Sequence, residues 1–262
     1  MFIIKHPKSI INFILLIVGI VGVVNLQKSN LNSQLNVQDT ASLSQREKLL
    51  QTSVALQKQL PELGIGNLIA DWNYLKFIQY FGDYEARQAT GYSLVTDYFE
   101  AVLKKDPHFT EAFLSFSTAN SLFAARPDKT VDFINRITES ASPELPGYPF
   151  LLWTYKATDE ILFLGDLEAA KNSYEQAAKW AKARQDELGD KMAERYEKTA
   201  AFLATNPDST QAQIGAWMNI LSTTTEPRTA EYIISRLQEL GVTVGFTEDG
   251  QLVIDRPEVT ES

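Results

Sequence analysis

The sequence lacks cysteine altogether and has only two histidines, His6 and His108. Without cysteine the chain can form no disulfide, thiolate metal site or cysteine nucleophile, and it is compatible with an oxidising compartment. A serine–histidine–aspartate triad would depend on His108, and no Gly-x-Ser-x-Gly segment is present to hold the serine. No Asp-x-Asp-x-Asp loop gathers carboxylates for calcium. We therefore predict a protein that is not an enzyme, with no cofactor and no metal site.

Positive charge is also scarce, because 24 lysine and arginine residues stand against 33 aspartate and glutamate residues, a net charge of −9 at pH 7. An acidic surface repels phosphate backbones, so we expect no nucleic acid among the partners. The length of 262 residues is enough for one globular domain of ordinary size, with some chain left over.

A long apolar run lies at the N-terminus. Lys5 and Lys8 precede apolar residues from position 10 onward, and counted to Leu26 the run is about 17 residues long, at the short end for a membrane span. Because no Ala-x-Ala-like cleavage site follows, we favour an uncleaved signal anchor in residues 1–27 over a cleaved signal peptide. A buried core helix is the third alternative, but the run is apolar all round. The positive-inside rule then predicts a single-pass membrane protein with a cytoplasmic N-terminus and an extracytoplasmic main domain.

The rest of the chain divides into three segments by composition. Residues 28–43 are rich in Asn, Gln and Ser, which predicts a flexible polar stalk. Apolar residues recur at spacings of three and four through residues 44–240, which predicts a series of helices. In residues 241–262, β-branched runs flank an Asp-Gly pair, so we predict a β-hairpin and a loose tail. An isolated hairpin is marginally stable, so it should pack on the last helices or pair with a partner strand.

The most regular segment is residues 165–178, where Gly165, Ala170 and Ala177 are small and Tyr174 is aromatic. In a helix, Ala170, Tyr174 and Ala177 lie at positions i, i+4 and i+7 and share one face. A face of small residues with one ring lets a second helix approach closely. The segment therefore predicts one half of a tightly packed helical pair.

This segment resembles the second helix of a tetratricopeptide repeat (TPR). The junction at residues 105–113, where Pro107 precedes Ala112 and Phe113, is similar to the boundary between two such repeats. The resemblance covers roughly residues 90–240 and extends loosely to bacterial membrane-anchored TPR proteins of unassigned role. It implies an all-α fold in which an N-terminal transmembrane helix precedes a TPR-like solenoid of helical hairpins, with a small C-terminal β-hairpin. In a bacterium the main domain would face the periplasm or a lumen.

In TPR proteins the first helices of the repeats form a concave wall that binds extended peptides or partner helices. Carried onto this sequence, the resemblance assigns wall positions to Leu114, Thr118, Ser121, Leu152, Tyr155, Lys156 and Asp159. Tyr155, Lys156 and Asp159 offer a ring, a cation and an acceptor, which suits peptide recognition. The alternative is that these residues form an ordinary solvated helix face.

The resulting hypothesis is a membrane-anchored TPR-like scaffold for protein–protein interaction, engaged in assembly of a membrane or envelope complex, with an unidentified protein or peptide as partner. Two alternatives remain open. Residues 137–143 resemble the Glu-Ser block of lytic transglycosylases, in which Glu139 would serve as acid and base for cell-wall cleavage, although the downstream Gly-Leu-Met-Gln element is missing. A permanent structural subunit of a larger membrane complex is the other, and it should expose a large apolar patch.

Overall fold

The structure, a computed structural model, describes residues 16–22, 24–25, 40–61, 64–246 and 252–255. Helices account for most of these residues, so the predicted all-α class is confirmed. The elements are α2 Thr40–Gln59, α3 Gly66–Gly82, α4 Tyr84–Thr90, α5 Val95–Lys105, α6 Thr110–Leu122, α7 Pro127–Ser140, α8 Phe150–Asp159, η1 Glu160–Leu164, α9 Leu167–Lys182, α10 Glu187–Leu203, α11 Thr210–Thr223, α12 Pro227–Glu239, β1 Thr243–Phe246 and β2 Leu252–Asp255.

The chain divides into two compact units, Met1–Arg46 and Glu47–Ser262. In the first unit, described residues 16–22 and 24–25 are helical, as is the start of α2. No helix in the described part of the chain is long and apolar enough to cross a membrane. The prediction of a single-pass membrane protein with an extracytoplasmic main domain is therefore wrong, and most of the predicted signal anchor, residues 1–27, lies outside the described residues. Most of the predicted stalk lies outside the described residues.

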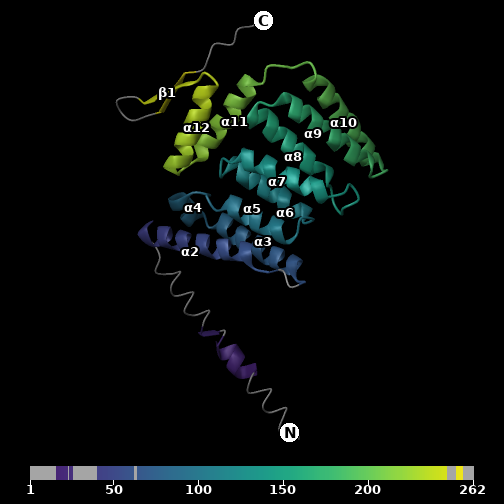
Figure 1. Cartoon of the computed structure of the whole chain (residues 1–262). Coiled ribbons are helices and arrows are strands. Elements are labelled where there is room, and N and C mark those ends of the chain that lie inside the picture. Colours follow the sequence, from purple (N-terminus) through teal and green to yellow (C-terminus); the bar gives the residue numbers. More distant parts are fainter. Residues whose placement is uncertain (1–15, 23, 26–39, 62–63, 247–251, 256–262) are drawn as a thin grey trace. The chain divides into compact units, whose positions relative to one another are not determined.

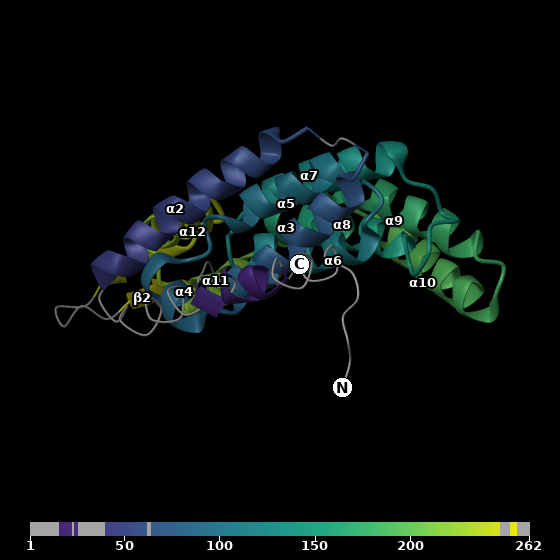
Figure 2. The same cartoon turned by 90° about the horizontal axis from the view of Figure 1, so that it is seen from below.

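In the second unit, helices that follow one another in the chain pack in pairs. α6 packs on α7, α8 on α9, α9 on α10 and α11 on α12, and a contact between α6 and α8 joins the first two pairs. Figure 1 shows these helices as successive layers, from α3 and α5 through α6 and α7 to α8, α9 and α10. In Figure 2, α9 and α10 lie on the opposite side of α8 from α3 and α5. The arrangement brings α6 and α8 side by side.

Local sequence signals determine many of the helix ends. Asp83, Asp166 and Asp186 cap α4, α9 and α10, and each carboxylate accepts a hydrogen bond from a backbone N–H of the first turn. Pro227 opens α12, at a position where the helix does not use the missing N–H. α5 carries two lysines in its last turn, beside the negative end of the helix dipole.

One helix departs from the regular α-helical pattern. α8 ends at Asp159, and the chain continues as one turn of π-helix, η1, to Leu164. Gly165 follows with φ at +68°, a left-handed conformation that glycine adopts without strain. A Cβ at this position would lie 3.0 Å from the Gln213 side chain, so glycine also allows a close approach of α11. The Gly165–Asp166 turn between the two helices agrees with the pattern in the sequence.

The largest buried cluster is aromatic and lies between α3, α5, α6 and α7. The Phe116 ring centroid is 4.1 Å from that of Phe77 and 5.1 Å from that of Phe99. A second cluster joins η1 to α11 and α12, with the rings of Phe163 and Trp217 5.0 Å apart. Burial of these rings supplies much of the apolar area that holds the layers together.

The small-residue face of α9 packs as predicted. Ala170 and Ala177 are fully buried. Ala177 lies in a third cluster with Phe150 from α8 and Tyr196 from α10, so helices approach α9 from two sides. The missing side-chain bulk is what permits both contacts at once.

The C-terminal strands also agree with the sequence. β1 and β2 pair antiparallel, with Val244 opposite Ile254 and Phe246 opposite Leu252. The predicted Asp-Gly turn lies outside the described residues. β1 contacts α12, and Val244 packs on the second cluster, so the hairpin rests on the last helix as expected.

Asn73 on α3 is an uncompensated polar group in the core. Its side chain is fully buried, and neither amide atom has a hydrogen-bond partner among the described residues. An unsatisfied buried amide destabilises a fold by about 1–3 kcal/mol. We expect Asn73→Leu to raise the free energy of unfolding by about 1–2 kcal/mol, measured by urea denaturation. Asn172→Leu, on the exposed face of α9, is the control, and a loss of stability in Asn73→Leu alone would contradict the expectation.

Candidate functional site

A groove lies over α3, α6 and α8 and consists of two adjoining pockets. The first, which we name the apolar pocket, has a volume of about 420 Å³ and is lined chiefly by Phe77, Ile78, Phe81, Leu114, Phe123 and Tyr155. The second, which we name the hydroxyl pocket, has a volume of about 310 Å³ and is lined chiefly by Thr118, Ser121, Thr154, Thr158, Asp159 and Leu162. Thr118 and Tyr155 line both pockets. The pockets therefore join into one groove.

Most of the predicted wall residues meet in this groove. Leu114 belongs to the apolar pocket, Ser121 and Asp159 belong to the hydroxyl pocket, and Thr118 and Tyr155 lie where the two join. Residues from the first helix of each pair, α6 and α8, thus face a common space.

Leu152 and Lys156 do not reach the groove. Leu152 is fully buried in the aromatic core, and the Lys156 side chain is only 12 % exposed. Tyr155 and Asp159 are four residues apart and share one face of α8, whereas Leu152 and Lys156 share another. Adjacent residues on a helix point about 100° apart, so Tyr155 and Lys156 serve different surfaces. The predicted combination of ring, cation and acceptor is therefore divided, with the cation turned away.

Lys156 instead belongs to a buried ion pair. Its ammonium lies 2.9 Å from Glu160 Oε1 and 2.9 Å from Ser173 Oγ, and the Ser173 hydroxyl donates to Glu160 Oε2 at 2.7 Å. The Glu160 side chain is 3 % exposed. These contacts fasten the junction of α8 and η1 to α9.

A chain of polar groups forms the floor of the hydroxyl pocket. Ser121 Oγ lies 2.5 Å from Asp159 Oδ2 and 2.8 Å from Thr130 Oγ1. Asn120 donates from Nδ2 to Thr130 Oγ1 and accepts at Oδ1 from the Thr96 hydroxyl. Burial raises the pKa of Asp159 to about 8, and the neighbouring Glu160 acts in the same direction, while the hydrogen bond with Ser121 opposes the rise. Asp159 is thus a mostly protonated carboxyl at neutral pH.

Several groove residues are not among those predicted from the sequence. Phe77, Ile78 and Phe81 come from α3, which precedes the stretch with the repeat resemblance. Thr154 and Thr158 also line the hydroxyl pocket. Their spacing of four, on the helix that carries Asp159, is a signal that could have identified them. η1 adds a further sign, because single-turn π-helices are rare and often occur at functional sites.

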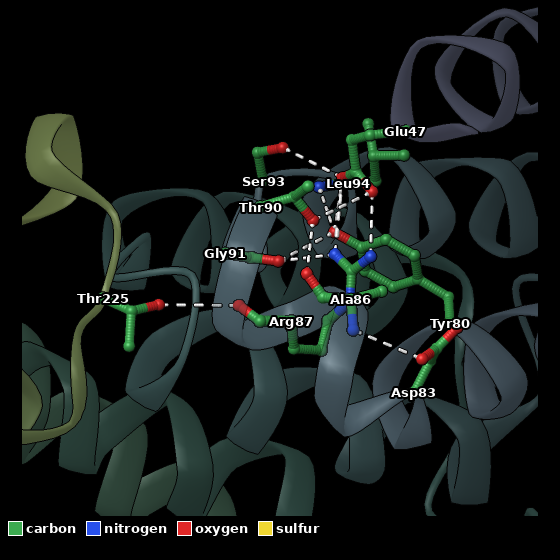
Figure 3. Close-up of polar contacts among 10 residues, drawn as sticks. All are labelled: Glu47, Tyr80, Asp83, Ala86, Arg87, Thr90, Gly91, Ser93, Leu94 and Thr225. Carbon is green, nitrogen blue, oxygen red and sulfur yellow. Dashed lines mark hydrogen bonds and ion pairs between the residues drawn. The ribbon is translucent and has the colours of Figure 1, made fainter. Parts of the chain in front are cut away.

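A second buried polar cluster joins α2, α3 and α4 (Figure 3). The Arg87 guanidinium is 2.8 Å from Glu47 Oε2 and stacks 3.6 Å from the centre of the Tyr80 ring. The Tyr80 hydroxyl donates to Glu47 Oε1 at 2.9 Å, and Arg87 also donates to the Gly91 carbonyl. These groups are directed at one another, so we interpret the cluster as a structural fastening that holds α2 and α4 to α3.

The residues weighed for catalysis lie away from the groove. Glu139 is exposed in the last turn of α7 and lines neither pocket, so it lacks the enclosed setting of a glycosidase acid. The ring of His108 contacts the Ser140 carbonyl through Nε2 at 3.3 Å on the surface. Among the described residues, no group of three or more His, Asp or Glu side chains is arranged to hold a metal ion.

Comparisons with protein-family models, with curated proteins and with solved structures found no match for this chain.

Proposed function

We propose that this protein is a TPR-like helical-repeat scaffold whose groove over α3, α6 and α8 binds a peptide segment of another protein. The observation that supports the proposal best is the convergence of α6 and α8 residues on two joined pockets. The packing of α6 on α7 and α8 on α9, with α6 against α8, is the order expected for stacked repeats.

The chemistry of the groove suits a peptide. One end is apolar and aromatic, and the other carries hydroxyls and one carboxyl, so the groove offers anchorage for apolar side chains and acceptors for polar ones. Recognition modules commonly combine these features, with a few aromatic anchors contributing most of the affinity.

An apolar row along α3 extends the surface. The side chains that form it are 47 % to 65 % exposed, and they are Ile65, Leu68, Trp72, Leu75 and Ile78. Ile78 also lines the apolar pocket, so the row and the groove are continuous. Large exposed apolar patches usually mark interaction surfaces, and this row favours an apolar or amphipathic partner segment. It is also the feature expected of a permanent subunit, which is the second candidate.

Thr118 allows a direct test because it is exposed at the junction of the two pockets. A random-peptide display library is selected on the wild-type protein, and the enriched peptides are measured by fluorescence anisotropy. We expect Thr118→Arg to fill the groove and weaken binding by at least about tenfold, or roughly 1.4 kcal/mol. Thr223→Arg, on the exposed end of α11, should leave the affinity within about twofold. Peptides that bind both variants alike, or the absence of any enrichment, would contradict a peptide-binding groove.

A further inference from the structure

The hydroxyl pocket presents acceptors rather than donors. Four hydroxyls in its wall each donate their single hydrogen to the carbonyl one turn earlier: Ser117 to Phe113 at 2.7 Å, Thr118 to Leu114 at 3.4 Å, Thr154 to Phe150 at 3.4 Å and Thr158 to Thr154 at 2.9 Å. A hydroxyl oxygen has two lone pairs, so each oxygen can still accept a hydrogen bond, including that of Thr158, which also contacts the Tyr174 hydroxyl. Apart from the Tyr155 phenol, the side-chain polar groups lining the pocket are therefore placed to accept hydrogen bonds.

Asp159 adds a carboxyl without a cation. It is 6 % exposed and lines the pocket, and Ser121 occupies its Oδ2. Within the described part of the chain, no hydrogen bond to its other oxygen and no ion pair is found. The Lys156 ammonium, on the same helix, is held by Glu160 and Ser173. A buried carboxyl usually has a partner, so one open to a cavity indicates a ligand that supplies it.

We propose that the hydroxyl pocket binds the side-chain ammonium of a lysine carried by the peptide in the groove. The inference deepens the proposed peptide-binding function and rests on it. Leu122, Leu162 and Phe163 complete the pocket wall and suit the methylene stem of the lysine. The ammonium donates its hydrogens to the free oxygen of Asp159 and to threonine hydroxyl oxygens. Asp159 gives up its proton to solvent as the ion pair forms.

Lysine fits this pocket better than arginine. A guanidinium prefers a carboxylate with both oxygens free for a two-bond fork, and one oxygen of Asp159 is already taken by Ser121. An ammonium is a compact charge whose three hydrogens can go to separate acceptors. The scattered hydroxyl oxygens around Asp159 match that demand.

The hydroxyl chain behind Asp159 accommodates both charge states. When Asp159 is protonated, it donates to Ser121, which donates to Thr130, and Thr130 donates to the Arg126 carbonyl. When Asp159 is ionised, Ser121 donates to it and Thr130 donates to Ser121. Each hydroxyl needs only to rotate, so loss of the proton leaves no buried group unsatisfied.

The surroundings of Asp159 leave it as the group that titrates on binding. Glu160 on η1 is paired with Lys156, and Arg126 and Asp128 at the start of α7 are paired with each other. Tyr155 on α8 and Tyr174 on α9 are phenols, and the polar side chains that α6 contributes to the pocket lining are all hydroxyls. Since the pKa of Asp159 in the unliganded pocket is about 8, a bound cation must displace a proton from Asp159 at pH values below about 8. Affinity for an ammonium should therefore rise with pH up to about 8 and then level off.

Hexylammonium is a suitable probe, with hexanol and hexanoate as its neutral and anionic matches. Binding to the full-length protein is followed by NMR titration, with the Asp159 carboxyl carbon as reporter. At pH 7 we expect hexylammonium to bind at least about tenfold more tightly than hexanol, and hexanoate not to bind. From pH 6 to 8 its Kd should fall by up to about tenfold per pH unit, while that of hexanol stays constant.

Asp159→Asn is the matched variant, since an amide resembles the protonated acid and should fold like it. In this variant hexylammonium should lose its preference over hexanol, whereas Asp208→Asn, in an exposed loop, should keep it. An equal Kd for the two probes in the wild type, or an unchanged preference in Asp159→Asn, would overturn the proposal. The proposal would also be overturned if displayed peptides whose binding depends on Thr118 kept their affinity when each lysine was replaced by norleucine. A failure of the proposed function is distinct, because no peptide would then depend on Thr118.

Discussion

Replacement of Arg87 by methionine is expected to lower the free energy of unfolding by about 3–5 kcal/mol, because it leaves a largely buried carboxylate without its cation. The side chains of Arg87 and Glu47 are 3 % and 14 % exposed. The guanidinium also satisfies the Gly91 carbonyl and covers the Tyr80 ring. Methionine preserves much of the volume and none of the charge, so the loss reports the polar contacts.

The effect should depend on the partner that is left behind. The double variant Glu47→Leu with Arg87→Met removes both charges, and we expect it to recover much of the stability lost in the single variant. Arg195→Met, on the exposed face of α10, should stay within about 0.5 kcal/mol of the wild type in the same urea denaturation. If Arg87→Met matched Arg195→Met, the cluster would have no part in fastening the helices.

This cluster also bears on the groove. Tyr80 lies on α3 between Ile78 and Phe81, which line the apolar pocket. A hold on Tyr80 therefore limits the rotation of α3 and fixes the position of the pocket wall. The polar cluster and the apolar pocket therefore share helix α3, although no residue belongs to both.

Features of the fold that depend on neighbouring residues in the chain could be predicted from the sequence. The aspartate caps, the opening proline of α12 and the alternation of the β-hairpin act over a few residues. The buried face of α9 followed from its spacing of small residues. The signal anchor was inferred from hydropathy, flanking lysines and the lack of a cleavage site, and no helix among the described residues is both long and apolar enough to cross a membrane.

Features that depend on contacts between distant residues could not be predicted in this way. The repeat resemblance placed Tyr155 and Lys156 on one wall, but the second is turned toward Ser173, on the next helix. The π-helical turn after Asp159 shifts the angular positions of the side chains that follow it. No residue type in this segment predicts such a turn. The share of α3 in the groove arises from its packing beside α6, outside the stretch with the repeat resemblance.

Mutations of the adjacent residues Tyr155 and Lys156 on α8 should accordingly affect different properties, peptide binding for Tyr155 and stability for Lys156. We expect Lys156→Met to lower the free energy of unfolding by about 3–5 kcal/mol, since it strands the carboxylate of Glu160 in a site that is 3 % exposed, next to Asp159. Lys156→Glu should be worse, because it adds a third carboxyl. Tyr155→Ala, on the half-buried wall of the groove, should mainly weaken peptide binding.

Urea denaturation of paired variants tests the origin of the Lys156 effect. Adding Glu160→Gln to Lys156→Met should recover part of the loss at pH 7, and Lys179→Met on the exposed face of α9 should cost little. A Lys156→Met protein as stable as Lys179→Met would contradict a buried ion pair. That result would indicate that the Lys156 ammonium faces the groove. A lysine of the bound peptide would then be repelled by Lys156.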